Sequence, residues 1–542
     1  MKEVSNRLGF PQMEEEILEF WRQENIFQKS IDQRPEDKAF SFYDGPPFAT
    51  GLPHYGHLLA GTIKDVIPRY KTMRGFRVER RFGWDTHGLP VEYEVEQALK
   101  LNGRHEIETF GEANFNEECR AIVLRYTREW QETVERMARW VDFDNDYKTM
   151  DIDFMESVWW VFKRLWDKGL IYEGVKVVPY SWRVSTPLSN FEANLNYKDI
   201  QDPSVTLRFK VKGEENLYFL AWTTTPWTLP SNMGLCAGPK LIYSKIRDKK
   251  SGDCYILTKT RINTYFEEGS FEVLAEMQGT ELQGMTYEPL FDFAKSHIDT
   301  TNTWAIQLDD YVSDESGTGI VHLACFGEDD VRIFQRENIP IFDPVDEEGN
   351  FLDYMGFVAG KNIKDADKLI IQRLKDEGKM FLHETVQHSY PFCWRTDTPL
   401  IYKPISTWFV NVEAIKEKMV AHNRTVHWVP GHIRDGRFGK WLENARDWAI
   451  SRNRFWGTPL PVWKSDDGEV MCIGSVEELQ EKTGKKIDDL HKHFVDPLVI
   501  EQNGKTFRRV TEVLDCWFES GSMPYAQEHY PFENKDRFEA NF

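Results

Sequence analysis

The sequence predicts an α/β protein in which a parallel-sheet domain is interrupted by a β-rich insert. Short apolar runs alternate with helical patterns over about the first 170 residues. Between about residues 200 and 345 the chain changes to short alternating runs such as VTLRFKV and LYFLAWT, which Gly, Asn and Asp turns separate. Helical patterns return from about residue 405. The strand-rich stretch is therefore predicted to be inserted into the first domain.

Helical patterns dominate the first part of the chain. They cover residues 11–27, 57–70 and 117–168. In the first of them Ile17, Leu18 and Trp21 share one face, as an amphipathic helix requires. Gly169 is the predicted stop of the last. Strand-then-loop patterns occupy residues 41–51 and 77–90. Because these strands alternate with helices, a parallel sheet is predicted.

Two similar segments flank the predicted insert. SWRVSTPL at residues 181–188 resembles CWRTDTPL at residues 393–400. The two segments could form paired ribbons at the neck of the insert, and chance repetition would explain the similarity equally well. The predicted domains are a first half over 1–183, the insert over 184–392 and a second half over 393–542, which carries a small insertion near 464–510.

Composition excludes several classes of protein. The 542 residues are 41% hydrophobic and 29% charged, which excludes a disordered or collagen-like chain. No apolar run approaches the roughly 20 residues that span a bilayer. The seven cysteines contain no CxxC pair, so a disulfide framework or a Cys-rich zinc site is not expected. The net charge of −21 argues against wholesale wrapping of nucleic acid, although a local basic groove stays possible.

The sharpest chemical signal is PHYGH, which follows the loop DGPPFATG. A helix N-terminus at this point would present free N–H groups and a positive dipole end to phosphate. Gly56 would let a nucleotide approach the backbone, and His54 and His57 would donate to phosphate oxygens. This pattern predicts nucleotidyl transfer with ATP. The alternative is a pair of helix-end histidines that cap the backbone.

A second signal is Asp85 in GWDTHGLPVE, which directly follows a predicted strand. Ligands bind at the carboxyl ends of strands in α/β sheets, so this carboxylate could hold a substrate ammonium. A loop-bracing role is the alternative. Trp-lined loops at 451–463 and 513–525 are as compatible with a pocket as with a core.

Two motifs of the insert carry further polar groups. AWTTTPWTLPSN places three successive threonines before Pro226 and Trp227. GTGIVHLACFGEDD places His322 and three acids, Glu328, Asp329 and Asp330, on what the glycines predict to be loops. Metal binding by the three acids is conceivable, and a plain acidic turn is favoured, because magnesium usually recruits substrate phosphates.

Together these motifs resemble those of the class I aminoacyl-tRNA synthetases, and among them the isoleucyl-tRNA synthetases. DGPPFATGLPHYGH is similar to the HIGH signature, and GWDTHGLPVE to its isoleucyl companion. WTTTPWTLP and GTGIVH resemble the editing insert of the isoleucyl, valyl and leucyl enzymes. SRNRFWGTPLP and LDCWFESGS match the second half of the catalytic domain, so the resemblance runs from about Phe10 to the last residue. It implies a Rossmann-like (HUP type) catalytic domain interrupted by an editing (CP1) insert.

The resemblance also implies roles for individual residues. Catalysis would fall to His54 and His57, and ATP binding to His54, Gly56 and His57. The isoleucine site would be lined by Gly45, Pro46, Asp85 and Trp517, with Asp85 on the α-ammonium. The editing pocket would contain Thr223, Thr224, Thr225, Trp227, His322 and Asp330.

The activity that the resemblance implies is ATP-dependent formation of isoleucyl-adenylate and transfer to tRNA(Ile). Hydrolytic editing of mischarged valine would follow, because one methylene in an apolar pocket discriminates by only about 1–3 kcal/mol, a limit that this enzyme class itself illustrates. ATP would enter with Mg²⁺. The expected partners are isoleucine, ATP and tRNA(Ile), and we expect a cytoplasmic monomer with no membrane attachment.

The chain departs from the family pattern at two places. Many relatives hold zinc with a CxxC pair in each neck ribbon, whereas this chain has Ser181, Val184, Cys393 and Thr396. A tetrahedral site needs four ligands, so no structural zinc is expected in this portion. The KMSKS loop and the anticodon-binding domain are also not found, and KEKMV at 416–420 lies in a helical pattern. We therefore expect a piece of a longer enzyme.

Alternative functions are not excluded by the residues alone. A free-standing aminoacyl-tRNA deacylase would use the α/β part as a scaffold. A valyl-type synthetase, another HxGH nucleotidyltransferase and a non-catalytic binding module are further alternatives. The preference for an isoleucyl enzyme rests on GWDTHGLPVE and Trp517.

Overall fold

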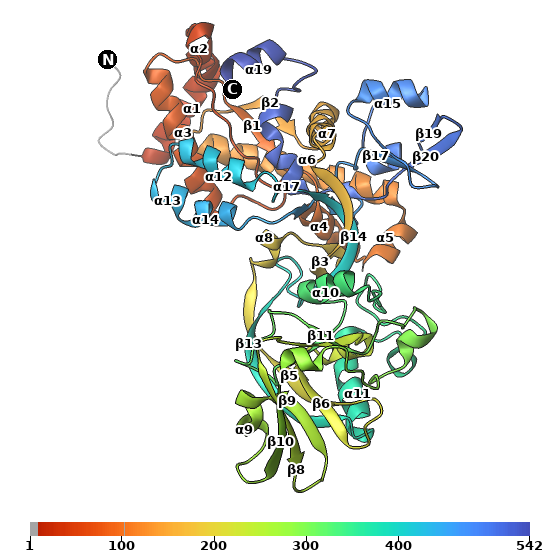
Figure 1. Cartoon of the computed structure of the whole chain (residues 1–542). Helices are drawn as coiled ribbons and strands as arrows, with labels where there is room; N and C mark the ends of the chain where they lie inside the picture. Colours follow the sequence, from red (N-terminus) through yellow and green to blue (C-terminus); the bar gives the residue numbers. More distant parts are fainter. Residues whose placement is uncertain (1–8, 102) are drawn as a thin grey trace. The chain divides into compact units, whose positions relative to one another are not determined.

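The computed structural model describes residues 9–101 and 103–542, and its chain divides into two compact units. Unit 1 consists of Met1–Tyr172 and Trp408–Phe542, and unit 2 is Glu173–Thr407. The boundaries fall within strands β3 (Ile171–Ser181) and β14 (Ile401–Val410) (Figure 1). The predicted α/β fold class with a β-rich insert is confirmed.

Unit 1 is mainly helical. Its helices are α1 (Phe10–Gln23), α2 (Ile26–Asp32), α3 (Tyr55–Met73), α4 (Leu89–Leu99), α5 (Arg104–Phe110), α6 (Glu112–Arg136), α7 (Ile152–Asp167), α12 (Lys416–Thr425), α13 (His432–Asp435), α14 (Arg437–Glu443), α15 (Val476–Thr483), α16 (Lys492–Val495), α17 (Cys516–Gly521), α18 (Met523–Ala526) and α19 (Lys535–Asn541). As predicted, Gly169 follows the end of α7 in a left-handed conformation, with φ of +68°.

The amphipathic helix predicted over residues 11–27 forms, but its predicted extent is wrong. It ends at Gln23, and Asn25 adopts a left-handed conformation with φ of 48° before α2 begins. α1 has no buried residue, and the side chain of Ile17 is 49% exposed. The amphipathic pattern is real, but its apolar face is only partly covered: Leu18 and Trp21 are partly buried, and Trp21 packs edge-on against Trp140 with ring centroids 5.3 Å apart.

A small parallel sheet positions the predicted site. Strand β1 (Arg81–Trp84) pairs in parallel with β2 (Asp142–Lys148). The strand predicted within 41–51 does not form. Instead this segment follows the sheet through isolated parallel bridges from Ala39 to Arg77 and from Phe48 to Asp85. The physical reason is that Pro46 and Pro47 have no N–H group, so the segment cannot build a continuous ladder.

The predicted small insertion near 464–510 is a separate sheet module of unit 1. Its four antiparallel strands follow the order β18-β17-β20-β19. They are β17 (Val462–Ser465), β18 (Val470–Cys472), β19 (Val499–Gln502) and β20 (Lys505–Arg509). The fully buried Trp463 packs edge-on against Trp159 of α7, with ring centroids 6.1 Å apart. Three short strands complete unit 1: β15 (Trp448–Ala449), β16 (Ser451–Arg452) and β21 (Val513–Leu514).

Unit 2 is built on a large, mostly antiparallel sheet. Its strand order is β10-β8-β9-β6-β12-β7-β11, with β5 pairing both β6 and β13. The strands are β5 (Tyr197–Lys210), β6 (Leu217–Thr223), β7 (Gly234–Ala237), β8 (Ile242–Asp248), β9 (Cys254–Thr258), β10 (Phe271–Gln278), β11 (Ile306–Leu308), β12 (Ile320–Leu323) and β13 (Met380–Pro391). The helices are α8 (Asn190–Ala193), α9 (Ile262–Tyr265), α10 (Glu328–Glu337) and α11 (Ile363–Asp376). β5 and β13 run side by side along almost their whole length (Figure 1).

The two similar segments that flank the insert adopt the same turn. Ser185 and Asp397 occupy equivalent positions, and both are left-handed, with φ of 48° and 57°. In each hairpin the leucine that follows the turn donates its N–H to a proline carbonyl nine residues earlier, at 2.8 Å for Leu188 and 3.0 Å for Leu400. The indole N–H of Trp182 in the first hairpin donates to the carbonyl of Pro399 in the second at 2.9 Å. The repetition is therefore structural.

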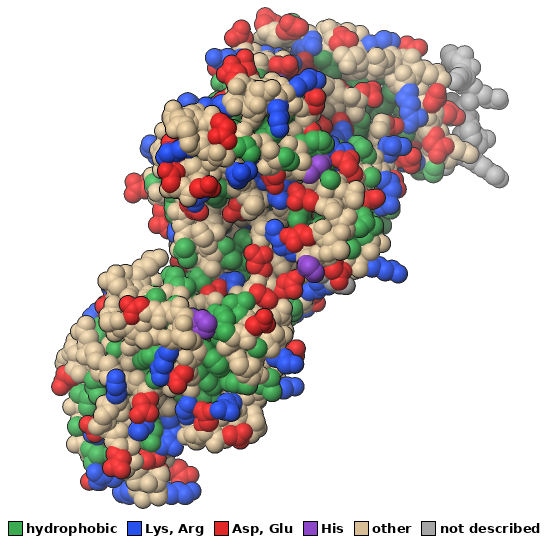
Figure 2. All heavy atoms as spheres, turned by 90° about the vertical axis from the view of Figure 1, so that its right-hand side faces the viewer, with side chains coloured by type: hydrophobic (Ala, Val, Ile, Leu, Met, Phe, Trp, Pro, Cys, Tyr) green, Lys and Arg blue, Asp and Glu red, His purple; other side chains and the backbone are tan. Residues whose placement is uncertain are grey.

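Among the described residues, no helix combines the length and the apolar character that crossing a membrane requires. On the face shown in Figure 2, Lys and Arg side chains are interspersed with Asp and Glu side chains, so the net charge of −21 is not segregated there.

Candidate functional site

The first residues of α3 bring the two histidines of PHYGH together. His54 is the N-cap, and its ring stacks on that of His57 with centroids 3.7 Å apart. The Gly56 N–H donates to His54 Nδ1 at 3.0 Å, and the His54 N–H donates to His57 Nδ1 at 3.2 Å. A Cβ at Gly56 would lie 2.9 Å from His54 Cε1, so the glycine makes room for this ring. Both Nδ1 atoms therefore cap the helix, as the alternative interpretation proposed.

The same cap fixes the chemistry of the two rings. Because each Nδ1 accepts a hydrogen bond, the neutral form of each ring carries its proton on Nε2. Burial, with the charges of His54 and Lys64, lowers the pKa of His57, which favours that neutral form. Two Nε2–H donors at the N-terminus of a 19-residue helix are suited to an anionic oxygen. Capping the helix and donating to phosphate are thus compatible.

Asp85 lies directly after β1 in a buried position and is 1% exposed. The Asp85 N–H donates to the Pro47 carbonyl at 2.8 Å, and the Ala49 N–H donates to the Asp85 carbonyl at 2.9 Å. The backbone amide of His87 donates to the carboxylate, but the buried Oδ1 has no hydrogen-bond partner in the structure. Burial, and then the charge of Glu519, raise the pKa of Asp85 well above its usual value. Among the residues that the structure describes, none with a positive charge forms an ion pair with this carboxylate.

Aromatic and small residues lie beside Asp85. Phe48, which bridges to Asp85, packs edge-on against Trp517 with centroids 5.5 Å apart. Trp517 is the second residue of α17, whose N-cap Asp515 accepts its N–H at 3.1 Å. Gly45 is exposed, and a Cβ there would have no atom within 4 Å, while Pro46 is partly buried. Phe48 therefore contacts both Asp85 and Trp517, which are 432 residues apart in the sequence.

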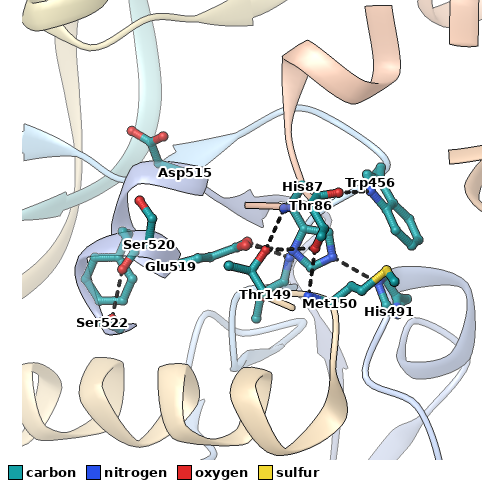
Figure 3. Close-up of polar contacts among 12 residues, drawn as sticks. Thr86, His87, Thr149, Met150, Trp456, His491, Asp515, Glu519, Ser520 and Ser522 are labelled. Atoms are coloured by element: carbon teal, nitrogen blue, oxygen red, sulfur yellow. Dashed lines mark hydrogen bonds and ion pairs between the residues drawn. The ribbon is translucent and has the colours of Figure 1, made fainter. Parts of the chain in front are cut away.

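Sequence reasoning missed a buried polar cluster behind Asp85. His87 Nδ1 lies 2.6 Å from a carboxylate oxygen of Glu519, and its Nε2 lies 3.0 Å from Nε2 of His491 (Figure 3). Thr86 bonds to Thr149 at 2.9 Å beside them. His87 and Glu519 stand inside quoted motifs, which could have identified them. His491, in the small inserted module, has no local signal.

In unit 2 the Thr-rich motif forms a hydroxyl cluster at the end of β6. The Thr225 N–H donates to Thr223 Oγ1 at 3.1 Å, and the two hydroxyl oxygens are 3.2 Å apart. Thr224 is partly exposed between them. Trp227 belongs to the 3₁₀ helix η2 (Pro226–Ser231) and packs on Phe326 with centroids 4.5 Å apart. Trp227 is buried and lines the core side of the turn.

His322 lies on strand β12 and not on a loop, which corrects the prediction. Its Nε2 lies 2.8 Å from the Thr228 hydroxyl, and the Asn232 side-chain amide donates to its Nδ1 at 3.1 Å. The Tyr287 hydroxyl donates to Asn232 at 2.7 Å. Burial lowers the pKa of His322 to about 4, so the ring is neutral with its proton on Nε2. Thr228, Asn232 and Tyr287 were not predicted.

The three acids of GEDD also lie on a helix and not on a loop. They form the first turn of α10, where negative side chains are favoured by the helix dipole. Glu328 and Asp329 are exposed, whereas Asp330 is largely buried. Asp330 accepts from the Ala324 N–H at 3.1 Å and from the Tyr311 hydroxyl at 3.4 Å. Burial raises its pKa to about 7.

The four neck positions considered for zinc hold Ser181, Val184, Cys393 and Thr396. Ser181, Val184 and Cys393 are buried, and Thr396 bonds to the Thr398 hydroxyl at 2.8 Å. Within the described residues, no group of three or more His, Cys, Asp or Glu side chains is arranged to hold a metal ion. That this portion lacks structural zinc stays a prediction.

A family model, tRNA synthetases class I (I, L, M and V), matches residues 16–542. The chain belongs to this family.

Similar class I synthetases come from chlamydiae and their relatives. The chain is 55% identical over 539 residues to the isoleucine–tRNA ligase of Chlamydia trachomatis serovar A and 56% identical over 540 residues to that of Chlamydia caviae. It is 55% identical to that of Protochlamydia amoebophila. Each alignment covers 98–99% of this chain and 52% of the relative. The chain thus spans about half the length of the relatives that it matches.

Proposed function

We propose that this chain forms the ATP-binding and amino-acid-binding part of an isoleucine–tRNA ligase, with unit 2 as its editing domain. Family membership and the identity to isoleucine–tRNA ligases support this function. The observation that carries the proposal is the buried carboxylate of Asp85, whose Oδ1 has no partner. Burying a carboxylate costs several kcal/mol unless a cation or donors compensate it. The α-ammonium of an amino acid supplies both a charge and donors.

Isoleucine would lie between Asp85 and the aromatic side chains of Phe48 and Trp517. The ammonium donates to Asp85 Oδ1, and the aliphatic side chain meets the aromatic rings. Gly45 and Pro46 form the rim of this site, where the absence of side-chain bulk at Gly45 leaves space. Apolar contact of this kind discriminates isoleucine from valine only weakly, which makes a second, hydrolytic site useful.

ATP, entering with Mg²⁺, would lie at the N-terminus of α3. The Nε2–H groups of His54 and His57 donate to its phosphate oxygens, and Gly56 keeps the cap compact. One carboxylate oxygen of isoleucine then attacks the α-phosphorus, and the bond to the pyrophosphate oxygen breaks. The products are isoleucyl-adenylate and pyrophosphate. No protein nucleophile is required, because orientation and charge stabilisation lower the barrier.

Unit 2 would hydrolyse valine from mischarged tRNA(Ile). Asp330 pairs with the ammonium of the valyl ester, and the hydroxyls of Thr223, Thr224 and Thr225 orient the ester and a water molecule. His322 is neutral and holds Thr228, so its contribution is to position the threonine turn and not to transfer a proton. Trp227 supports the same turn from the core side.

Isoleucine-dependent exchange of pyrophosphate into ATP by the protein tests the synthetic activity. Asp85→Asn keeps the size of the side chain and removes the charge, so we expect exchange to fall by at least about tenfold. Asp153→Asn, an exposed acid in the first turn of α7, is the control. Exchange that is unchanged in Asp85→Asn would overturn the proposal.

Two alternatives are separated by the same assays. A free-standing aminoacyl-tRNA deacylase is favoured by the compactness of unit 2, which holds its own polar cluster. It would hydrolyse valyl-tRNA(Ile) without any isoleucine-dependent exchange. A valyl-type synthetase would exchange pyrophosphate with valine in preference to isoleucine.

A further inference from the structure

The helices α12, α13 and α14 form a basic segment in an acidic protein. Residues 416–446 contain seven lysines and arginines against three acids, whereas the whole chain has a net charge of −21. The three helices contact one another within unit 1 (Figure 1). We call residues 416–446 the basic helical segment. The function proposed above uses none of its residues.

Side-chain hydrogen bonds and a close glycine contact hold the basic helical segment together. The Asn423 side-chain amide of α12 donates to the Arg434 carbonyl of α13 at 2.8 Å, and the Trp428 indole N–H donates to Asn423 Oδ1 at 2.9 Å. A Cβ at Gly439 of α14 would collide with the same Arg434 carbonyl, so the glycine lets α13 and α14 pack closely. Trp428 packs on Phe438 with ring centroids 4.9 Å apart. The exposed side chains of the segment are therefore displayed on a fixed framework.

The exposed face of α14 carries two cations next to an aromatic ring. Arg437 and Lys440 are exposed, and the side chain of Trp441 is 53% exposed. Because Arg437 precedes the other two residues by three and four positions, it is a neighbour of both on the helix surface. Leu442 is buried on the other side of the helix, and Phe438 contacts the ring of Trp441 with centroids 5.5 Å apart. About half of this tryptophan is therefore packed, and the other half is accessible.

The cations of this face have no acidic partner. Among the residues that the structure describes, Lys418, Arg437 and Lys440 form no ion pair and no hydrogen bond through their side chains. Of the three acids in the segment, Asp435 already pairs with Arg434 at 2.8 Å. The other two acids are exposed: Glu417 and Glu443. Exposed cations that no acid neutralises attract anions, and their clustering along a helix is typical of contacts with nucleic acid.

The basic helical segment is attached next to the proposed amino-acid site of unit 1. It follows β14 and precedes β15, which pair with each other through Val410 and Trp448. The indole N–H of Trp448 donates to Asp515 at 3.2 Å, and Asp515 is the N-cap of α17, the helix that carries Trp517. The segment therefore starts and ends beside the helix that contributes Trp517 to the proposed isoleucine site.

We propose that the exposed face of α14 binds an unpaired nucleotide at the single-stranded end of an RNA. Trp441 stacks on the base, and Arg437 and Lys440 contact neighbouring phosphates. A nucleotide has both an aromatic face and a negative charge, so it matches both features of this surface. An apolar protein surface would use the ring without the cations, and duplex RNA would use the cations without the ring.

This inference rests on the proposed function, in which the RNA is tRNA(Ile). Its unpaired 3′ end has to reach unit 1 to receive the aminoacyl group. The attachment of the basic helical segment beside α17 suits a contact with that end. The proposed function assigns no residue of unit 1 to the RNA, so α14 supplies a surface for a partner that the reaction requires.

Stacking and phosphate contact respond to different changes. On a single strand, each phosphate that a cation contacts adds about 0.7 to the slope of log affinity against log salt concentration, because counterions are released. Stacking depends on the ring, and bases of every kind have a face that can stack. Removal of the two cations should therefore lower the salt slope. Removal of the ring should lower the affinity at an unchanged slope.

The experiment measures binding of a fluorescent single-stranded RNA, with the sequence of the tRNA 3′ end, to the protein by anisotropy at several KCl concentrations. Arg437→Gln combined with Lys440→Gln should lower the salt slope by up to about 1.4. Trp441→Leu keeps an apolar side chain that favours a helix but removes the ring, so we expect about tenfold weaker binding. Trp441→Tyr restores a ring and should stay within about threefold of the parent.

Lys485→Gln combined with Lys535→Gln is the matched control. Both lysines are exposed in unit 1 and, among the described residues, form no ion pair. The control has the same change of net charge, and we expect it to keep the parent's salt slope. Circular dichroism verifies that every variant is folded. A loss in the control as large as that in the α14 double variant would overturn the inference, because net charge alone would then explain binding.

Three other results would also overturn the inference. A fully paired hairpin RNA that binds as tightly as the single strand would show that no base stacks. Equal affinities of Trp441→Tyr and Trp441→Leu would show that the ring is not needed. A dimer in sedimentation that Trp441→Leu dissociates would assign the ring to a second copy of the chain.

Failure of the proposed function is distinguishable from failure of this inference. Isoleucine-dependent pyrophosphate exchange, with Asp85→Asn as its variant, tests the proposed function without RNA. RNA binding through Trp441 in a protein that shows no such exchange would support the RNA surface and reject the proposed function. Exchange that depends on Asp85, together with RNA binding that the α14 variants do not change, would reject only the RNA surface.

Discussion

We expect Asp330→Asn to stabilise unit 2 at pH 8 and at the same time to slow hydrolysis of valyl-tRNA(Ile). The carboxylate of Asp330 accepts only from the uncharged Ala324 N–H and Tyr311 hydroxyl. Burial therefore raises its pKa from 3.8 to about 7. Asparagine can accept from the same Ala324 N–H without carrying a charge, so the substitution isolates the cost of ionisation.

The size of the stabilisation follows from the pKa shift. A shift of roughly three pH units corresponds to at most about 4 kcal/mol, and partial exposure of the side chain reduces this to about 2 kcal/mol. Because the folded-state pKa is raised, the contribution to stability is fully present below about pH 4 and is lost as the pH rises through about 7. The variant should therefore gain stability at pH 8 and little at pH 4.

Hydrogen exchange of the backbone amides of β12 and α10 measures this local stability, once the observed rates are corrected for the effect of pH on intrinsic amide exchange. Deacylation of valyl-tRNA(Ile) measures the function. Loss of a charge-assisted hydrogen bond of roughly 1.5–3 kcal/mol should lower kcat/KM by about 10- to 100-fold. Asp329→Asn, an exposed neighbour that pairs with Arg332, is the control and should change neither.

Two results would refute this reasoning. An unchanged pH dependence of stability in Asp330→Asn would mean that burial does not govern the titration of this carboxylate. Undiminished hydrolysis in a stabilised variant would make Asp330 a purely structural acid. If Glu328→Ala abolishes hydrolysis instead, the ammonium site belongs to a different acid of the first turn of α10.

Four other substitutions or measurements test the remaining assignments. Gly56→Ala should push the ring of His54 off its cap, cost α3 about 1 kcal/mol in urea unfolding and lower isoleucine-dependent exchange. Gly45→Ala has open space around its Cβ, so the free energy of unfolding should change by less than about 0.5 kcal/mol, while calorimetry shows weaker isoleucine binding. Since its pKa is about 4, His322 should cause no inflection in the deacylation rate between pH 5.5 and 8. Elemental analysis should find no tightly bound zinc, because Cys393 is the single thiol at the neck positions.

Local patterns predicted the elements that depend on a few neighbouring residues. The helix predicted over 57–70 forms as α3, although it begins at Tyr55, because His54 and His57 complete a cap within four residues. Gly169 follows α7 because a left-handed residue favours glycine. The interpretation of 11–27 as one continuous helix was wrong, since the left-handed Asn25 separates α1 from α2. The strand expected within 41–51 was wrong because consecutive prolines remove the donors that pairing needs.

The sequence by itself determined the fold class, the family and the positions of the motifs that carry chemistry. Helix caps, strand alternation and glycine turns are governed by contacts between near neighbours, and these can be recognised one segment at a time. The sequence also identified Asp85 and Asp330 as candidate binding residues, but it did not show which groups surround them.

Only the tertiary structure decided what those residues touch. His87 meets Glu519 and His491 across 432 and 404 residues, and His322 meets Thr228 across 94. The charge state of a buried group depends on burial and on the charges that folding brings near it, and neither quantity is a property of a segment. That is why the tertiary structure was needed to show that Asp85 is a buried carboxylate with an unpartnered oxygen.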